Sequence, residues 1–204
     1  MGYSNYEQIK TVAKKFKFEV RITSLFPKID IVQPSACLVE SLRRSSVMVL
    51  TNEKTKLERV VSPILLEIAQ AYTENFSFFS GELLDVNEAD DLVDECDFFF
   101  TLHPPRPYVD APIVSMIKSK DEDLEWGVAQ CAAQMYAAKL YNETEGKVMP
   151  TIFGCVTDGT EWQFVKLEND VFHLDNRVIT DLPSILGVWH QILKSLLTTF
   201  KLKK

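Results

Sequence analysis

The sequence lacks long hydrophobic runs, although 46% of its 204 residues are hydrophobic. A stretch of about eighteen consecutive apolar residues would be needed for a transmembrane helix, and none occurs. The first ten residues, MGYSNYEQIK, contain no apolar segment, so we expect no signal peptide. These absences predict a protein of the cytoplasm, with no membrane contact and enough apolar residues for one sizeable core.

Cysteine and histidine are scarce, with four and three residues respectively. No C-x-x-C motif occurs, and no histidine follows a cysteine at the spacing of a zinc site, so this class of structural metal site is excluded. None of the histidines has a Ser, Cys or acidic residue at a spacing typical of a catalytic triad. We expect buried free thiols in a reducing compartment at these positions: Cys37, Cys96, Cys131 and Cys155.

The chain also lacks an excess of positive charge, because its formal net charge is −7. Phosphate contacts require clustered Lys and Arg, so this balance argues against a simple electrostatic nucleic-acid binder. The basic clusters KKFKF (residues 14–18) and KLKK (residues 201–204) are short. Clusters of this size often serve solubility alone.

Hydrophobic periodicity predicts an α/β protein with a mixed central sheet flanked by helices. Helices are expected over residues 6–16, 35–45, 123–141 and 182–200, with a further helix that begins at Thr51 or Asn52 and is kinked or broken at Pro63. Strands are expected within residues 76–86, 95–102, 113–120, 150–159, 161–169 and 171–175. We therefore predict an N-terminal helical extension over residues 1–50 and an α/β core over residues 51–204.

Polar residues gather around two of the expected strands. Lys118 and Lys120 are two apart in IVSMIKSK and share one face of a strand, and Asp97 opens the apolar part of the preceding strand. On the following helix, Gln130 and Gln134 are four apart and share a face. Spacing alone leaves two interpretations open: a functional site, or a partly exposed sheet edge with ordinary ion pairs.

Residues 52–193 resemble the PD-(D/E)XK nuclease superfamily, and most of all an uncharacterised bacterial, notably cyanobacterial, group of restriction-endonuclease-like proteins. The segments that carry the resemblance are NEKTKLERVVSPILLEI, FSGELLDV, CDFFF, APIVSMIKSK, GVAQCAAQMYAAKLYN, IFGCVTDGTEWQFVKLEN and ILGVWHQIL. They cover about two-thirds of the chain in the family's order. The resemblance implies a restriction-endonuclease-like core and a Mg²⁺-dependent phosphodiester hydrolase ancestry.

In that superfamily an Asp on one strand and a Glu on the next bind Mg²⁺, and a Lys two residues after the Glu orients or deprotonates the attacking water. By resemblance the Asp is Asp97 and the Lys is Lys120, with Gln130 beside them on the helix. The Glu position falls on Lys118. A cation at this position opposes the metal's own charge, so we expect a degenerate site with no metal cofactor or only weak Mg²⁺ or Mn²⁺ binding.

A relocated carboxylate would restore the site. The candidates are Glu67, which shares a helix edge with Ile64, and four others: Glu53, Glu58, Glu82 and Glu122. We therefore expect a nuclease-like protein whose active site is degenerate. Its role would be binding or regulation that involves nucleic acid, and DNA is favoured over RNA. An active Mg²⁺-dependent endonuclease and an interaction protein without nucleic-acid contact are the alternatives, and the resemblance leaves a homodimer open.

Overall fold

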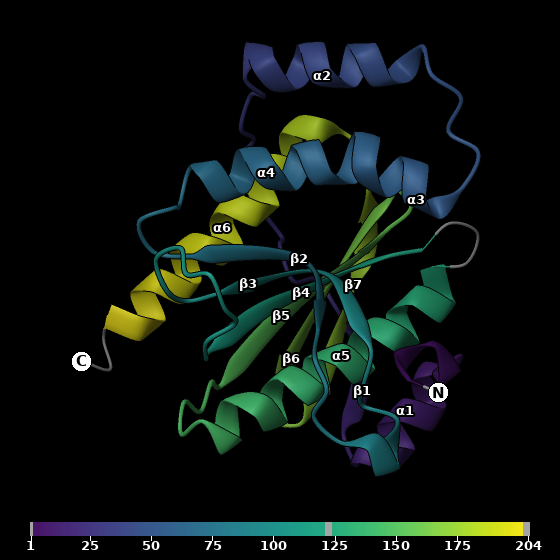
Figure 1. The fold of residues 1–204 in the computed structure, drawn as a ribbon, viewed down its shortest axis with the longest axis vertical. Coiled ribbons are helices and arrows are strands. Elements are labelled where there is room, and N and C mark those ends of the chain that lie inside the picture. Colours follow the sequence, from purple (N-terminus) through teal and green to yellow (C-terminus); the bar gives the residue numbers. More distant parts are fainter. Residues whose placement is uncertain (1, 121–123, 202–204) are drawn as a thin grey trace.

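The computed structural model describes residues 2–120 and 124–201, and it shows an α/β protein built on one seven-stranded sheet (Figure 1). The strand order is β1-β7-β6-β5-β4-β3-β2. The β1–β7 and β4–β5 pairs are parallel and the other neighbours are antiparallel. The strands are β1 Glu19–Thr23, β2 Ser77–Leu83, β3 Glu95–Thr101, β4 Ile113–Ser119, β5 Thr151–Thr157, β6 Trp162–Glu168 and β7 Val171–Ile179. The predicted α/β class with a mixed central sheet is confirmed.

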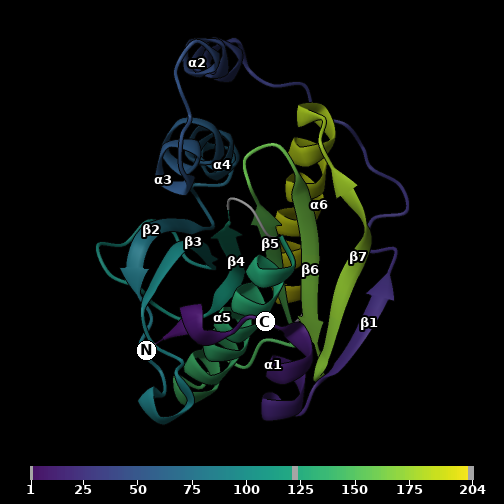
Figure 2. The ribbon, with the colours of Figure 1, turned by 90° about the vertical axis from the view of Figure 1, so that its right-hand side faces the viewer.

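Helices cover both faces of this sheet. One buried cluster lies under α1 and α5, and a second lies under α4 and α6. The helix α2 lies outside α4, away from the sheet (Figures 1 and 2). The helices are α1 Ile9–Phe16, α2 Ala36–Ser46, α3 Glu53–Lys56, α4 Ser62–Gln70, α5 Leu124–Thr144 and α6 Leu182–Lys201, with short turns η1 Tyr3–Asn5, η2 Leu57–Val61 and η3 Glu88–Asp90.

The helix α5 lies close to the sheet because its sheet-facing residues are small. A Cβ on Gly127 would lie 2.4 Å from Val156 Cγ1, and a Cβ on Gly154 of β5 would lie 2.6 Å from Met135 Sδ. These distances are shorter than any van der Waals contact, so both positions require glycine. On its outer side α5 is covered by α1, where Phe16 stacks on Tyr136 with ring centroids 4.3 Å apart. The helix is therefore buried on most of its circumference.

The segment after Asn52 forms α3, a π-helical turn η2, and α4 as one nearly continuous helix. Asn52 begins it with a capping box, in which its side chain accepts from the Thr55 backbone N–H at 3.0 Å. Pro63 has no backbone N–H and its ring crowds the preceding turn, and the wider π turn directly before α4 accommodates both effects. The helix was expected to be kinked or broken at Pro63, and its irregular turn lies just before that residue, at Leu57–Val61.

The N-terminal fifty residues are not purely helical, because β1 adds an edge strand to the sheet beside β7 (Figure 2). The expected helices are present, although α1 begins at Ile9, later than predicted. Ser35 is the N-cap of α2 and its hydroxyl accepts from Leu38 N–H. The boundary at residue 50 between an extension and a core stays a prediction.

Three of the four cysteines are buried free thiols, as predicted, but Cys37 is exposed. It lies in the first turn of α2, a helix that contributes only Leu38 to the buried residues. Among residues 2–120 and 124–201, no helix combines the length and the apolar character that crossing a membrane requires.

Candidate functional site

The strands β3 and β4 separate at the position of Asp97 and Lys118. Their backbone pairing ends at Phe98 opposite Ile117, whereas β4 continues beside β5 as far as Ser119 opposite Thr157. Beyond the Phe98–Ile117 pair, no β3 backbone carbonyl accepts the Ser119 N–H. The Asp97 carboxylate accepts it instead, at 2.6 Å. The backbone pairing of β3 with β4 therefore ends beside the two residues that the sequence singled out.

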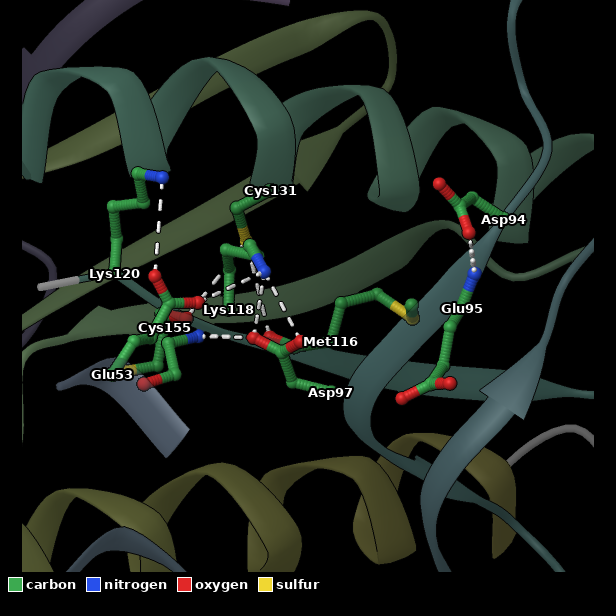
Figure 3. A network of polar contacts seen from close by, with 10 residues as sticks. Glu53, Asp94, Glu95, Asp97, Met116, Lys118, Lys120, Cys131 and Cys155 are labelled. Carbon is green, nitrogen blue, oxygen red and sulfur yellow. Dashed lines mark hydrogen bonds and ion pairs between the residues drawn. The ribbon is translucent and has the colours of Figure 1, made fainter. Parts of the chain in front are cut away.

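Lys118 directs its ammonium group at the Asp97 carboxylate (Figure 3). Its Nζ lies 2.8 Å from Oδ2 and 3.1 Å from Oδ1. The two side chains are only 14% and 15% exposed, so the pair is largely shielded from water. Both Asp97 oxygens are thus engaged by a cation, and Oδ2 also by a backbone N–H.

Glu53 joins this pair from the first turn of α3. Its Oε1 lies 3.8 Å from Lys118 Nζ, and its Oε2 lies 3.9 Å from Lys120 Nζ (Figure 3). The Asn52 capping box fixes where the helix begins and thereby places the Glu53 side chain at the sheet. Two carboxylates and two ammonium groups form an alternating network that we call the Asp97–Lys118 cluster: Glu53, Asp97, Lys118 and Lys120.

The charge state of Lys118 follows from this surrounding. Burial on its own lowers the pKa of Lys118, but the Asp97 charge, the hydrogen bonds to Asp97 and the Glu53 charge together raise this pKa above its usual value. Lys118 is therefore protonated at neutral pH, and it cannot accept a proton from a water molecule.

Lys120 lies at the end of β4, where its backbone N–H donates to Thr157 O at 2.9 Å. Its Nζ lies 5.0 Å from the centroid of the Trp126 ring, which is a cation–π distance. A Cβ on Gly127 would lie 3.0 Å from Lys120 Cβ, so the close approach of α5 also fixes the start of this side chain. Lys120 is 25% exposed and is the more accessible of the two lysines.

Gln130 and Gln134 are both buried on α5, with 4% and 1% exposure. Within the described residues, neither makes a hydrogen bond to Asp97, Lys118 or Lys120. The Gln134 Oε1 atom has no hydrogen-bond partner among them either. The structure thus brings Asp97, Lys118 and Lys120 together as predicted, and it places the glutamines in the interface between α5 and its neighbours.

Three other glutamates of the sequence analysis lie apart from the Asp97–Lys118 cluster. Glu67 binds Ser35 at the start of α2: its Oε1 accepts the Ser35 N–H at 2.7 Å, and its Oε2 accepts the Ser35 hydroxyl at 2.5 Å. Glu58 pairs with Lys54 at the surface, and Glu82 is exposed on β2. Glu122 lies outside the described residues. Among the described candidates, Glu53 is the carboxylate that reaches the two lysines, and its place at a helix start was the signal in the sequence.

The residues present do not fit a divalent metal ion as they are arranged. Oxygen ligands for Mg²⁺ must converge on one point, and here Asp97 and Glu53 converge on the Lys118 ammonium. In the part of the chain that the structure describes, no group of three or more His, Cys, Asp or Glu side chains is placed to hold a metal. Lys118 contacts both carboxylates and supplies the positive charge that they share.

The sequence matches no protein-family model, and it shows no significant similarity to a curated protein.

Proposed function

We propose that this protein is a nuclease-like protein of the PD-(D/E)XK type whose metal position is filled by Lys118, and that it acts in nucleic-acid-related binding or regulation rather than in cleavage. The observation that carries the proposal is the contact of Lys118 Nζ with both Asp97 oxygens. It supports a site that keeps polar residues where the superfamily has its metal-binding residues. The Lys118 ammonium then supplies the positive charge that a metal ion would otherwise supply.

The arrangement of elements supports the nuclease-like part of the proposal. A helix, α4, precedes three antiparallel strands, β2 to β4; α5 then crosses to β5, which pairs parallel with β4. Asp97 and Lys118 lie on the second and third of these strands, where the resemblance puts the acidic pair. The backbone pairing of β3 with β4 ends beside both residues.

Loss of cleavage follows from the chemistry of the cluster. A bound metal would offset charge on the transition state and lower the pKa of a bound water, and a lysine ammonium offers no open position for that water. Lys118 is itself held protonated by Asp97 and Glu53, so it cannot serve as the base instead. Phosphate binding through Lys120, the more exposed lysine, remains compatible with this arrangement.

Cleavage and binding assays on the purified protein test this proposal. We expect no hydrolysis of single- or double-stranded DNA or RNA with Mg²⁺ or Mn²⁺. Fluorescence anisotropy should show binding to short duplexes that weakens as salt rises, with DNA bound more tightly than RNA. Hydrolysis that Asp97→Ala abolishes would overturn the claim of a disabled site. If no nucleic acid binds even at low salt, the nucleic-acid role is wrong, and the net charge of −7 would favour a protein partner.

One observation favours an active enzyme as the second candidate. Glu53 lies within 4 Å of the same ammonium that Asp97 binds, so a single rotation of Lys118 away from the cluster would leave two carboxylates facing one position. Glu53 would then be the relocated carboxylate. Under this candidate, Glu53→Gln abolishes hydrolysis and Glu67→Gln leaves it unchanged.

A further inference from the structure

The strand β1 forms an open edge of the sheet. It stands at one end of the strand order, its one strand partner among the described residues is β7, and four of its five residues are exposed (Figure 2). The edge at the opposite end, β2, is interrupted by Gly81, which has φ +67°. Open edges present unpaired backbone groups that another strand can pair with. The regular open edge of this protein is therefore β1.

The free backbone groups of β1 belong to Val20 and Ile22. Glu19 N–H donates inward to Asp170 O beside β7. Because the backbone groups of successive strand residues point to opposite edges, those of Val20 and Ile22 point outward. Neither residue has a further backbone partner within the described residues. Their side chains are exposed as well, Val20 at 37% and Ile22 at 74%.

The charges of β1 are complementary to those of a second, antiparallel copy of β1. Glu19 and Arg21 lie on the other face of the strand and pair with each other, with Arg21 Nε 2.8 Å from Glu19 Oε1. If two copies of β1 met antiparallel with Val20 opposite Val20, each Glu19 would face Arg21 of the second copy. Residues opposite each other at such non-hydrogen-bonded positions have the closest side chains. Both charge pairs would therefore form across the junction.

The neighbouring register lacks this complementarity. With Val20 opposite Ile22, the two Arg21 side chains would face each other, and like charges directly opposite destabilise a sheet. In the register centred on Val20, the two exposed Val20 side chains lie opposite each other on the other face. Of these two registers, the charges of the strand favour the one centred on Val20.

We propose that the chain self-associates through β1, joining two seven-stranded sheets into one continuous sheet about a two-fold axis at Val20. This inference does not rest on the proposed function. A five-residue junction buries less surface than the roughly 1,000 Å² of a stable interface, so the dimer is weak and depends on concentration. The occupant of the edge is a second copy, and an extended peptide of another protein is an alternative outcome of the test.

Sedimentation velocity of the full chain over a wide concentration range tests the proposal. We expect the wild type to shift reversibly from monomer to dimer. Glu19→Arg and Arg21→Glu should each weaken the dimer roughly tenfold, because each turns two attractive pairs into two repulsive ones. An equimolar mixture of the two variants should associate more strongly than either alone, since their edges are complementary to each other. The double variant Glu19→Arg with Arg21→Glu should recover wild-type association.

A proline variant checks the backbone part of the proposal. Val20→Pro removes an outward N–H and leaves the bonds to β7 intact, so it should abolish the dimer while the circular dichroism spectrum stays that of the folded protein. A wild type that stays monomeric at every concentration overturns the proposal. So does a dimer that responds to none of these variants, and so does association with other chains only.

Discussion

Lys118 and Glu53 are joined by a contact of 3.8 Å between Nζ and Oε1, and the same ammonium binds both oxygens of Asp97. One cation therefore holds two carboxylates that come from elements more than forty residues apart in the sequence. The arrangement explains why a lysine leaves a buried strand at this position: its charge is compensated at once by Asp97 and by Glu53. The same contacts give the cluster a structural role that does not depend on any ligand.

The Asp97–Lys118 pair should stabilise the fold measurably. Asp97→Asn keeps an acceptor for the Ser119 N–H but removes the charge that compensates Lys118. We expect the free energy of unfolding to fall by about 1–3 kcal/mol, below the full cost of breaking a buried pair because both side chains keep some exposure. Urea denaturation measures the change.

A double variant distinguishes the loss of the ion pair from the cost of leaving one charge without its partner. Asp97→Asn with Lys118→Met removes both charges and should cost less than Asp97→Asn alone, since no uncompensated cation remains. Lys54→Met, which breaks the exposed pair with Glu58, is a matched control and should change stability by less than about 0.5 kcal/mol. Equal losses for the single and the double variant would mean that Lys118 needs no partner.

Gly127 should be required for the close approach of α5. Gly127→Ala adds a Cβ that would lie 2.4 Å from Val156 Cγ1, so either the helix or the strand must move. We expect a loss of about 1–3 kcal/mol despite the better helix propensity of alanine. Glu125→Ala, exposed on the same turn, should change stability far less. If Gly127→Ala stabilised the protein in thermal melts, the tight packing described for α5 would be wrong.

Acidification should destabilise the protein through its histidines. Burial lowers the pKa of His190, the nearby Lys194 charge lowers it further, and only Glu67 opposes. The pKa of His173 is likewise lowered, by burial and by Lys166. The folded protein therefore prefers neutral histidine: this stability is present above the unfolded-state pKa near 6.5 and is lost as pH falls through the folded-state values.

Melting temperatures between about pH 7.5 and pH 5 measure this effect, which should be smaller in His190→Gln because that variant has one histidine fewer to protonate. The variant also loses the contact of His190 Nδ1 with Tyr72 Oη at 2.7 Å, so its stability at neutral pH falls as well. An unchanged pH dependence in His190→Gln would contradict the assignment.

Glu67 should hold α2 in place rather than serve a metal site. Its carboxylate accepts both the N–H and the hydroxyl of Ser35 at the start of α2, whereas the Ser45 hydroxyl donates to Arg59 O near the other end. Glu67→Ala should raise amide hydrogen exchange over residues 36–46 while exchange in β3 and β4 stays as in the wild type. Faster exchange throughout the sheet would show that Glu67 supports the core instead.

The sequence predicted the sheet and the core of the cluster because these depend on local patterns. The apolar run in residues 113–120 indicated a strand, whose two-residue period put Lys118 and Lys120 on one face, and the apolar run after Asp97 identified its neighbouring strand. The strand β1 was missed, since EVRIT is a short edge strand with exposed side chains and follows a basic helix. No burial pattern distinguishes such a strand from a loop.

Helix phase explains why Glu67 was preferred to Glu53. Counting along a regular helix places Glu67 beside Ile64 and facing inward, but α2 covers that side of α4 and takes up its carboxylate. Glu53 lies before the π turn η2, whose i→i+5 hydrogen bonds shift the phase of the helix, so a regular count does not carry back to Glu53. The partner that settles the choice, Ser35, lies thirty-two residues away and has no signal in the periodicity.

Calorimetric titration with Mg²⁺ and Mn²⁺ tests most directly whether Lys118 fills the metal position. We compare the wild type with Lys118→Glu, and with Lys118→Glu combined with Asp97→Ala. Our account predicts no binding by the wild type, a new site in Lys118→Glu, and its loss in the combined variant. Metal binding by the wild type that Asp97→Ala abolishes would contradict it.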